Sequence, residues 1–311
     1  MRELIEKKYR ENKLIKFIVS PIKKIYDFYR YDVLDEETYI KNRFKRIFGF
    51  ELDLNNPKTL NEKIQWLKVN DRREILTITS DKYAVRDYIE KKIGSEYLIP
   101  LILMTKNPED LTYENLPESP FIIKTNHDSG SYLIVQDKNK VDFTKIQKKF
   151  KKLLKRNYYK ISKEWQYKNI PPKIIVEELL VDSGREAPLD YKFHCMNGEI
   201  IMISIDLNRI SNHQRNIYSK NWDLLPFTWS RMENNKVLWK NGDNVSPPKG
   251  LQKFIPIIEK ISEDFKYVRI DFYNINGTFY FGEITHHHGS GFEHITPIEW
   301  DLKLGEKLKL N

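Results

Sequence analysis

The fold is decided by the stretch VRIDFYNINGTFYFGEIT, which is residues Val268–Thr285. Two runs rich in β-branched and aromatic residues flank Asn276-Gly277, a dipeptide typical of a tight turn, so the stretch predicts a β-hairpin. Asp271 and Glu283 are twelve residues apart with the turn midway, and we expect them to lie opposite each other on paired strands. Arg269 shares their face, because side chains at i and i+2 of a strand point the same way.

This group of three side chains supports two interpretations. Two carboxylates and an arginine inside a mostly aromatic sheet are poorly stabilised without a counter-ion, and hard oxygen ligands suit Mg²⁺ beside a phosphate. The hairpin therefore indicates a magnesium site. The alternative is a cross-strand salt bridge with no bound ion.

Two further segments have the composition of a nucleotide site. Phe121–Ser131 is an apolar strand that ends in Lys124, followed by a loop of small and polar residues that would let backbone N–H groups approach phosphate oxygens. Ile174–Leu180 is an apolar strand that runs into the acids Glu177 and Glu178, which suits contacts with adenine and ribose. Taken alone, each segment also fits an ordinary loop or strand end.

Composition limits the class of protein. The chain has 311 residues, enough for two domains or one large α/β unit. Its single cysteine, Cys195, excludes a disulfide framework and a cysteine-based zinc site, and is typical of a reducing compartment. The longest apolar run, Leu98–Met104, is too short to span a membrane, and the N-terminus has no signal-peptide core. We therefore expect a cytoplasmic protein.

The net charge of +9 is concentrated in two segments. Val141–Ile170 has ten basic and two acidic residues, and its apolar spacing predicts an amphipathic helix over Asp142–Arg156. Met1–Arg30 is a second basic amphipathic stretch, in which we expect helices broken at Ser20-Pro21. Both can be solvated helix faces.

Alternatively, both segments contact an anionic partner, such as the inner membrane surface, a lipid-linked precursor or an acidic glycan. The protein would then be peripheral at the inner membrane face. Nucleic acid is disfavoured, because the chain has no zinc-finger spacing, RNP-like motif or clear helix-turn-helix.

The rest of the sequence predicts another hairpin and two helices around these segments. Asn197-Gly198 predicts a second hairpin, between Asp190–Met196 and Glu199–Asp206. Thr59 is expected to cap the helix that follows it, and Leu251–Phe265 is expected to be a helix.

In this order and spacing, the segments resemble the ATP-grasp superfamily and, more narrowly, the TupA-like ATP-grasp family, named for a teichuronopeptide biosynthesis protein. The resemblance covers roughly residues 40–305 and is carried by Asn56–Lys68, Asp81–Tyr83, Phe121–Lys124, Val176–Glu178, Asp190–Phe193, Arg269–Tyr273, Phe281–Thr285 and Gly289–Gly291.

The resemblance implies an α+β ATP-grasp fold, with two α+β lobes that grip ATP between antiparallel sheets and an N-terminal helical extension. The expected domains are a basic helical extension (1–50), an N-terminal α/β segment (51–118), a small nucleotide lobe (119–180) and a C-terminal lobe with the Mg²⁺ site (181–311).

The resemblance also implies roles for single residues. The implied nucleotide contacts are Lys82 and Lys124 for the phosphates, Gly130 and Ser131 for the mobile loop over the γ-phosphate, Glu177 and Glu178 for adenine and ribose, and Lys192 as a polar residue on the nucleotide side. The other implied roles are Asp271 and Glu283 as Mg²⁺ ligands, Arg269 on the transferring phosphoryl group, and Gly289-Ser290-Gly291 as the loop that meets the acyl substrate.

One position departs from the family pattern. Thr285 stands where many ATP-grasp enzymes have asparagine, so it would ligate weakly, through water, or not at all. His286-His287-His288 follows, and three adjacent strand residues cannot all point one way, which argues against a transition-metal site. One histidine, such as His286, could serve the substrate as acid or base, although loop structure is the favoured interpretation.

Arg215 and Trp222 follow the central strands. Arg215 could hold a substrate carboxylate and Trp222 could stack on a sugar ring, with a surface salt bridge as the alternative for Arg215.

The implied reaction joins a carboxylate to an amine through an acylphosphate, with ATP and Mg²⁺. The implied acceptor is a hexuronic acid carboxyl of a capsular or cell-surface polysaccharide or its precursor, and the donor is an amino acid or small amine. The alternatives are an ATP-dependent kinase of a glycan precursor, which would use the same lysines and Mg²⁺, and a catalytically decayed protein that binds glycan or membrane.

Overall fold

The computed structural model describes residues 13–182, 188–208, 212–234 and 236–311. The chain divides into two compact units, Met1–Leu52 and Asp53–Asn311. Residues 1–12 of the predicted basic N-terminal segment lie outside the described residues.

The N-terminal unit is helical. It consists of α2 (Lys13–Phe28), the π-helix η1 (Tyr29–Val33) and α3 (Glu36–Phe48). The predicted break at Ser20-Pro21 is wrong, because α2 continues through Pro21. Proline removes one helical hydrogen bond, and tertiary context can tolerate that loss. At the start of α3, the Asp35 carboxylate accepts a hydrogen bond from the Thr38 N–H at 2.9 Å, and the helix ends at Gly49.

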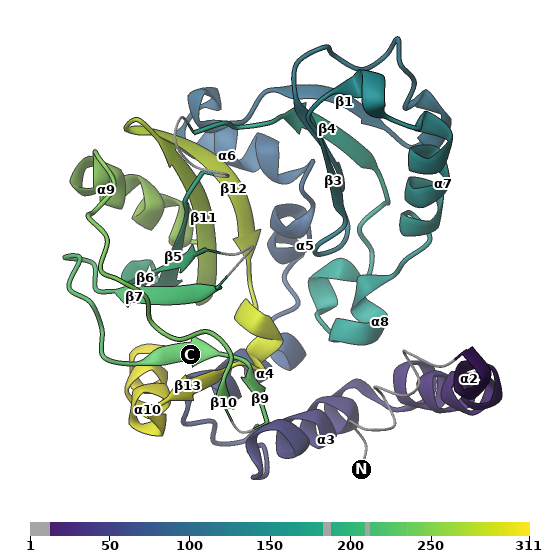
Figure 1. Cartoon of the computed structure of the whole chain (residues 1–311). Helices are drawn as coiled ribbons and strands as arrows, with labels where there is room; N and C mark the ends of the chain where they lie inside the picture. Colours follow the sequence, from purple (N-terminus) through teal and green to yellow (C-terminus); the bar gives the residue numbers. More distant parts are fainter. Residues whose placement is uncertain (1–12, 183–187, 209–211, 235) are drawn as a thin grey trace. The chain divides into compact units, whose positions relative to one another are not determined.

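The second unit contains a four-stranded antiparallel sheet of order β1-β4-β2-β3 (Figure 1). Its strands are β1 (Leu101–Thr105), β2 (Phe121–Thr125), β3 (Tyr132–Val135) and β4 (Ile174–Glu178). One face packs against α7 (Phe143–Leu153), where Ile146 and Phe150 join a core with Phe121 and Ile123. The predicted basic helix is confirmed, with Asp142 as its N-cap.

The same unit contains a five-stranded antiparallel sheet of order β12-β11-β5-β6-β7. Its strands are β5 (Asp190–Met196), β6 (Glu199–Leu207), β7 (Gln214–Tyr218), β11 (Tyr267–Ile275) and β12 (Thr278–Thr285). Both predicted hairpins are confirmed. Each Asn-Gly turn has positive φ at both positions, 52° and 89° at Asn197-Gly198 and 53° and 95° at Asn276-Gly277, as tight hairpin turns require.

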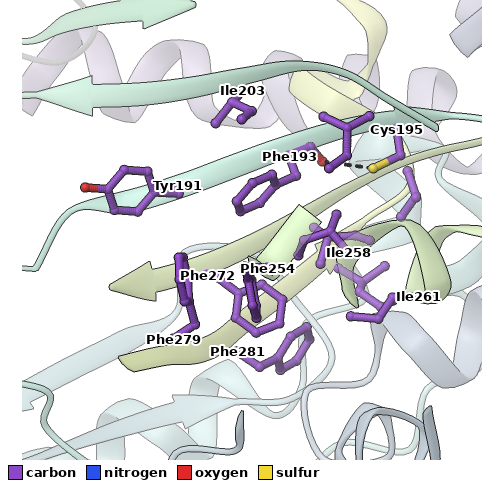
Figure 2. Close-up of a cluster of buried hydrophobic side chains, with 14 of the residues drawn as sticks. Tyr191, Phe193, Cys195, Ile203, Phe254, Ile258, Ile261, Phe272, Phe279 and Phe281 are labelled. Atoms are coloured by element: carbon purple, nitrogen blue, oxygen red, sulfur yellow. Dashed lines mark hydrogen bonds between the residues drawn. The ribbon is translucent and has the colours of Figure 1, made fainter. Parts of the chain in front are cut away.

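One face of this sheet is apolar and packs against α9 (Leu251–Ser262), which forms the main core (Figure 2). Phe193 and Phe272 point into that core, and the rings of Phe254 and Phe279 stack with centroids 3.9 Å apart. The strands alternate, so every second side chain reaches the opposite face. That opposite face carries the polar residues of the candidate site.

The remaining elements complete the unit. The helices are α4 (Leu60–Asn70), α5 (Glu74–Ser80), α6 (Val85–Ile93), α8 (Tyr158–Ser162) and α10 (Ile298–Lys307). The 3₁₀ turns are η2 (Ser95–Tyr97), η3 (Pro108–Asp110), η4 (Lys138–Lys140), η5 (Trp165–Tyr167) and η6 (His288–Gly291). The short strands are β8 (Thr228–Ser230), β9 (Met232–Glu233), β10 (Lys236–Val237) and β13 (His294–Thr296).

Helix α4 starts as predicted, with Thr59 and Glu62 forming a reciprocal capping box. It also packs against α10, where the buried Asp301 carboxylate accepts hydrogen bonds from the Asn61 N–H at 3.0 Å and the Asn61 Nδ2 at 2.9 Å. Within the described part of the chain, none of the helices combines the length and the apolar character that crossing a membrane requires.

Asp301 gives a prediction about stability. Burial raises the pKa of Asp301 to about 6, so the folded state holds its proton more strongly than the unfolded state does. The stabilisation from that proton is complete below pH ~4 and is lost as the pH rises through about 6. The difference between the unfolding free energies of wild type and Asp301→Asn (wild type minus variant) should therefore fall as the pH rises over this window. The fall should be on the order of 3 kcal/mol. Urea unfolding of both proteins measures it, and pH-independent separation of the two curves would contradict the assignment.

Candidate active site

The β11–β12 hairpin places Asp271 and Glu283 opposite each other, as predicted. A regular register would not do so. Near the turn Ile275 pairs with Thr278, a register that would put Gly282 opposite Asp271. A β-bulge at Gly282 shifts the strand by one residue and brings Glu283 into the pair.

Glycine suits this bulge because the neighbouring strand lies very close. A Cβ added to Gly282 would be 3.1 Å from the Asp271 carbonyl oxygen and 3.3 Å from the Tyr273 ring. The bulge also changes which face each side chain reaches. Phe281 joins the apolar core, whereas Glu283 lies on the polar face.

Arg269 joins the two carboxylates. Its Nε and one terminal nitrogen donate to the two Asp271 oxygens at 2.7 and 2.6 Å, and the same terminal nitrogen donates to Glu283 at 2.8 Å. Arg269 and Asp271 are buried, while the Glu283 side chain is 43% exposed. The predicted convergence of the three groups is therefore present, with the guanidinium paired to both acids.

The second guanidinium nitrogen of Arg269 extends the network to His288, whose Nδ1 is 2.8 Å away. The Nε2 of His288 lies 3.2 Å from Glu293, which also pairs with Arg215 at 3.0 Å. Burial raises the pKa of Glu293, but hydrogen bonds and charge from His288 and Arg215 outweigh burial and lower this pKa to about 2. Burial lowers the pKa of His288 to about 4.

Arg215 continues the network across the sheet. Its Nε donates to Asp206 at 2.7 Å, and Asp206 also pairs with Lys192 at 3.1 Å. Lys192 donates to Asp190 at 2.5 Å and is the register partner of Asp271 on β11. Arg215 is thus in a buried pair rather than the surface salt bridge that was one sequence interpretation.

The sequence interpretation missed three acids of this network, Asp190, Asp206 and Glu293. For Asp190, the alternation of polar and apolar residues along β5 was an available signal. For Glu293, nothing in the local pattern pointed to the site, because its partners Arg215 and His288 come from other elements.

Asp271 and Glu283 are the candidate ligands of a divalent cation, and in this structure both pair with Arg269, as in the cross-strand salt bridge that was the alternative. The polar network holds four cationic side chains, Lys192, Arg215, Arg231 and Arg269, against five carboxylates, Asp190, Asp206, Asp271, Glu283 and Glu293. Burial, and then the charges of Asp190 and Glu283, raise the pKa of Asp271 to about 7. A cation would relieve that unfavourable negative charge.

Asp271 and Glu283 would supply only part of such a coordination shell. Among the residues that the structure describes, no three His, Cys, Asp or Glu side chains are arranged to hold a metal ion. Mg²⁺ commonly binds one or two carboxylates and completes its shell with phosphates and water.

The four-stranded sheet supplies the basic side of the site. Lys124 on β2 pairs with Glu177 on β4 at 2.8 Å, and Arg86 on α6 pairs with the other Glu177 oxygen at 2.9 Å. Glu178, one residue later, is exposed. The two adjacent glutamates therefore differ, with Glu177 held between cations and Glu178 open to solvent.

Lys82 lies in the turn before α6, and its Nζ donates to the Asp128 carbonyl oxygen. Asp81 sets this turn, because its carboxylate accepts hydrogen bonds from the Tyr83 N–H and from Asn126 Nδ2, both at 2.8 Å. Burial lowers the pKa of Lys82, while the charge of Glu283 raises it. The lysine and carboxylate sides of the site therefore interact electrostatically.

The loop between β2 and β3 is closed by Asp128. Its carboxylate accepts a hydrogen bond from the Thr125 hydroxyl at 2.5 Å and another from the Ser131 hydroxyl. Gly130 is exposed, has φ +80° and has no atom within 4 Å of an added Cβ. The predicted phosphate loop thus has an open glycine beside a fixed serine.

Helix α4 holds the η6 loop. Gln65 donates to the carbonyl oxygens of Ser290 and Gly291 at 3.0 and 2.7 Å, and Lys68 donates to the Ser290 hydroxyl at 3.0 Å. Gly289, Ser290 and Gly291 all have positive φ. A side chain at Gly291 would come within 2.4 Å of Gln65 Nε2, so the close approach requires glycine.

The three consecutive histidines have separate partners. His286 Nε2 lies 2.8 Å from the Thr79 hydroxyl on α5, and His287 Nδ1 lies 3.1 Å from Gln166. Only His288 contacts Arg269. The structure thus brings His288 into the polar network and leaves His286 outside it. Thr285 is the register partner of Arg269, and its hydroxyl is 3.4 Å from Glu283.

Trp222 does not lie on this polar face. Its ring stacks on Tyr218 with centroids 4.5 Å apart, and its Nε1 donates to the Val245 carbonyl oxygen at 2.8 Å. Trp222 also packs against the apolar core. Trp222 therefore lies on the side of the sheet opposite the polar network, and its stacking on a sugar ring stays a prediction.

The profile of the family described as TupA-like ATPgrasp matches residues 62–309. A search of curated proteins finds no match.

Solved structures that the search matches to this chain include D-alanine–D-alanine ligase from Bacillus anthracis, with 15% identity and a TM-score of 0.40 over 68% of this chain and 58% of that one. The ATP-grasp ligase PsnB, complexed with minimal precursor, has 12% identity and a TM-score of 0.42 over 76% and 63%. D-alanine–D-alanine ligase from Helicobacter pylori has 15% identity and a TM-score of 0.40 over 81% and 70%. The chain spans about three fifths of the length of the first two.

The bulge at Gly282 gives a prediction about the register of Glu283. The variant Gly282→Val should destabilise the protein by about 1–3 kcal/mol, because the new side chain meets the neighbouring strand. It should also weaken Mg²⁺ binding, measured by isothermal titration. The control Thr278→Val places the same residue at an exposed position of β12 and should change neither quantity. Wild-type Mg²⁺ affinity in Gly282→Val would show that the bulge does not position Glu283.

Proposed function

The chain belongs to the TupA-like ATP-grasp family, and we propose that it is an ATP-dependent ligase that joins a carboxylate to an amine. The observation that carries the proposal is the convergence of Arg269, Asp271 and Glu283 on the polar sheet face, within electrostatic reach of Lys82.

The nucleotide would be held by the basic side of the site. Lys82 and Lys124 would contact the phosphates, with Gly130 and Ser131 above the γ-phosphate. Glu177 and Glu178 would face adenine and ribose. Lys192 would act from within the network, since it is buried between Asp190 and Asp206.

Asp271 and Glu283 would hold Mg²⁺. When bound, this ion supplies electrostatic stabilisation of negative charge on the phosphates. Arg269 lies between the two carboxylates and would neutralise charge on the transferring phosphoryl group. Because Arg269 is already held by Asp271, Glu283 and His288, it would contact the phosphoryl group only by exchanging one of these partners.

The proposed reaction has two steps. An oxygen of the acceptor carboxylate attacks the γ-phosphorus of ATP, ADP leaves, and an acylphosphate forms. An amine nitrogen then attacks the acyl carbon, inorganic phosphate leaves, and loss of one proton gives the amide. Catalysis of this kind depends mainly on positioning and on charge stabilisation.

The η6 loop is the proposed acyl-substrate contact, with Gly289, Ser290 and Gly291 held in place by α4. Thr285 stands beside it at the end of β12. Arg215 would act on the substrate only by exchanging a present partner, Asp206 or Glu293.

For the acceptor we propose a hexuronic acid carboxyl of a capsular or cell-surface polysaccharide or its precursor, and for the donor an amino acid or small amine. The family resemblance supports this choice. The reaction would then take place at the cytoplasmic face of the membrane.

The basic face of α7 is proposed to dock an anionic partner, either a glycan or a lipid surface. Lys148, Lys149 and Lys152 are exposed along it, and Lys151 pairs with Glu109 at 3.1 Å between two exposed side chains. Met1–Arg30 is the second proposed contact for an anionic surface.

Replacing the proposed metal ligands tests the ligase. Asp271→Asn and Glu283→Gln should each lower kcat for ATP turnover by about 100-fold or more, because each replaces a negatively charged carboxylate ligand with a neutral amide. Glu199→Gln, an exposed glutamate at the start of β6, is the matched control and should retain activity. Turnover is measured as ADP release with UDP-uronates and a panel of amines, with mass detection of the amide.

The products separate the ligase from its rivals. A ligase needs the amine and gives ADP, phosphate and an amide. Phosphate transfer to a hydroxyl without an amine would identify a kinase. A wild-type protein that neither binds nor hydrolyses Mg-ATP with any pair would contradict both enzyme proposals.

The docking face is tested by charge removal. Replacing Lys148, Lys149, Lys151 and Lys152 with Gln should weaken binding to oligogalacturonate or to phosphatidylglycerol vesicles, because the attraction is electrostatic. The KM for ATP should stay unchanged, since these lysines are separate from Lys82 and Lys124. A large rise in that KM would show instead that the face belongs to the nucleotide site.

A further inference from the structure

His288 links the Arg269 guanidinium to the Glu293 carboxylate. Its Nδ1 lies 2.8 Å from Nη1, one of the two terminal nitrogens of Arg269, and its Nε2 lies 3.2 Å from Glu293. The His288 side chain is 2% exposed, and the residue begins the η6 loop. One buried imidazole therefore contacts the proposed phosphoryl-binding arginine and belongs to the proposed substrate loop.

The partners of His288 fix the position of its proton. A guanidinium nitrogen can only donate, so the short contact with Arg269 requires a lone pair on Nδ1. Burial lowers the pKa of His288 to about 4, so the imidazole is neutral near pH 7. Its single N–H proton is therefore on Nε2 and faces the Glu293 carboxylate, as in sites where a carboxylate orients an imidazole.

Arg215 does not require a lone pair on Nε2. Its Nη1 lies 3.4 Å from Nε2 of His288, but that nitrogen donates its two hydrogens to Glu293 at 3.0 Å and to the Trp229 carbonyl oxygen at 2.9 Å. The rings of Trp229 and His194 also pack edge-on against the His288 ring, with centroids 4.3 and 4.9 Å away. The plane of the imidazole and its proton are thus both held.

The contact with His288 differs in charge from the other contacts of Arg269. Within the part of the chain that the structure describes, Arg269 bonds to three side chains, and two of them, Asp271 and Glu283, are acidic. An ion pair adds a Coulomb attraction that a neutral imidazole does not offer. An incoming phosphoryl oxygen would therefore replace the imidazole more readily than it would replace either carboxylate.

We propose that His288 is a positioning residue for Arg269. With its proton on Nε2, the imidazole holds Nη1 of the guanidinium in place until an oxygen of the transferring phosphoryl group replaces it as the acceptor. The proposal rests on the proposed ligase function, in which Arg269 contacts that group. His288 neither gains nor loses a proton in this role.

Two substitutions of His288 separate this role from packing. The amide oxygen of Asn takes the position of Nδ1, whereas the amide of Gln reaches the position of Nε2. His288→Asn should therefore keep kcat for ADP release within about threefold of wild type, because Arg269 retains an acceptor. His288→Gln should lower kcat on the order of 30-fold, because the guanidinium is no longer held in position.

Nucleotide binding is the second readout for both variants. The Kd for Mg-ADP, measured by titration calorimetry, should stay within about threefold of wild type, because ADP lacks the transferring phosphoryl group. Circular dichroism and urea unfolding of both variants show how much of each protein is folded, and kcat is calculated per folded molecule. Equal losses of kcat in the two variants would identify a purely structural role and overturn the proposal.

A double-mutant cycle tests whether His288 acts through Arg269. Arg269→Lys removes the nitrogen that the imidazole holds. Adding His288→Gln to that variant should therefore lower kcat by less than a further threefold or so. A further loss as large as in the wild-type background would show that His288 acts independently of the arginine, which would overturn the proposal.

The proton position is measured without turnover. Long-range proton–nitrogen correlation spectra near pH 7 should show a protonated Nε2 and an unprotonated Nδ1 for His288, whose signals His288→Asn identifies by their absence. A protonated Nδ1 would overturn the proposal. Wild type that releases no ADP, but has this tautomer and an Arg269 Nε–H signal that only His288→Gln broadens, would contradict the ligase alone.

Discussion

The pairing of the Arg269 guanidinium inside the five-stranded sheet is the constraint on which the rest of the polar face depends. A buried ion left without its partner costs about 3–5 kcal/mol, so every donor of this arginine must be matched. Asp271 takes two donors, Glu283 takes a third contact and His288 takes the remaining nitrogen. Because His288 is also the first residue of η6, this requirement positions the loop that α4 holds from the other side.

The two faces of the same sheet impose a second constraint, on which residues of each strand point to which face. Along β5 and β11, apolar side chains alternate with charged ones, so a slip of one residue would bury the network in the phenylalanine core. On β12 the alternation would fail without the bulge, because Phe281 and Glu283 are two residues apart and would share a face. Gly282 resolves the conflict by taking up one extra residue. The position of Glu283 and the packing of Phe281 in the core therefore depend on the same glycine.

Local pattern was enough to predict the hairpins, the basic helix and the opposition of Asp271 to Glu283. It failed where distant segments decide the outcome. Pro21 was expected to break a helix that continues through it, and Trp222 stacks on Tyr218 and packs against the apolar core. Glu293 was missed because its partners lie on β7 and η6, and no local periodicity relates such residues.

The two sides of the candidate site have opposite charge, so neither side alone identifies the ligand that the site would bind. On the sheet face the carboxylates outnumber the cations, whereas the other side presents Lys82 and Lys124, held by a carbonyl oxygen and by Glu177. A bare dication would complement only the carboxylates, and a bare phosphate only the lysines. A magnesium–nucleotide complex carries both charges in one ligand. The charge of Glu283 raises the pKa of Lys82 against the lowering by burial, so the two sides of the site interact, and the proposed magnesium–nucleotide complex suits both sides better than either ion alone.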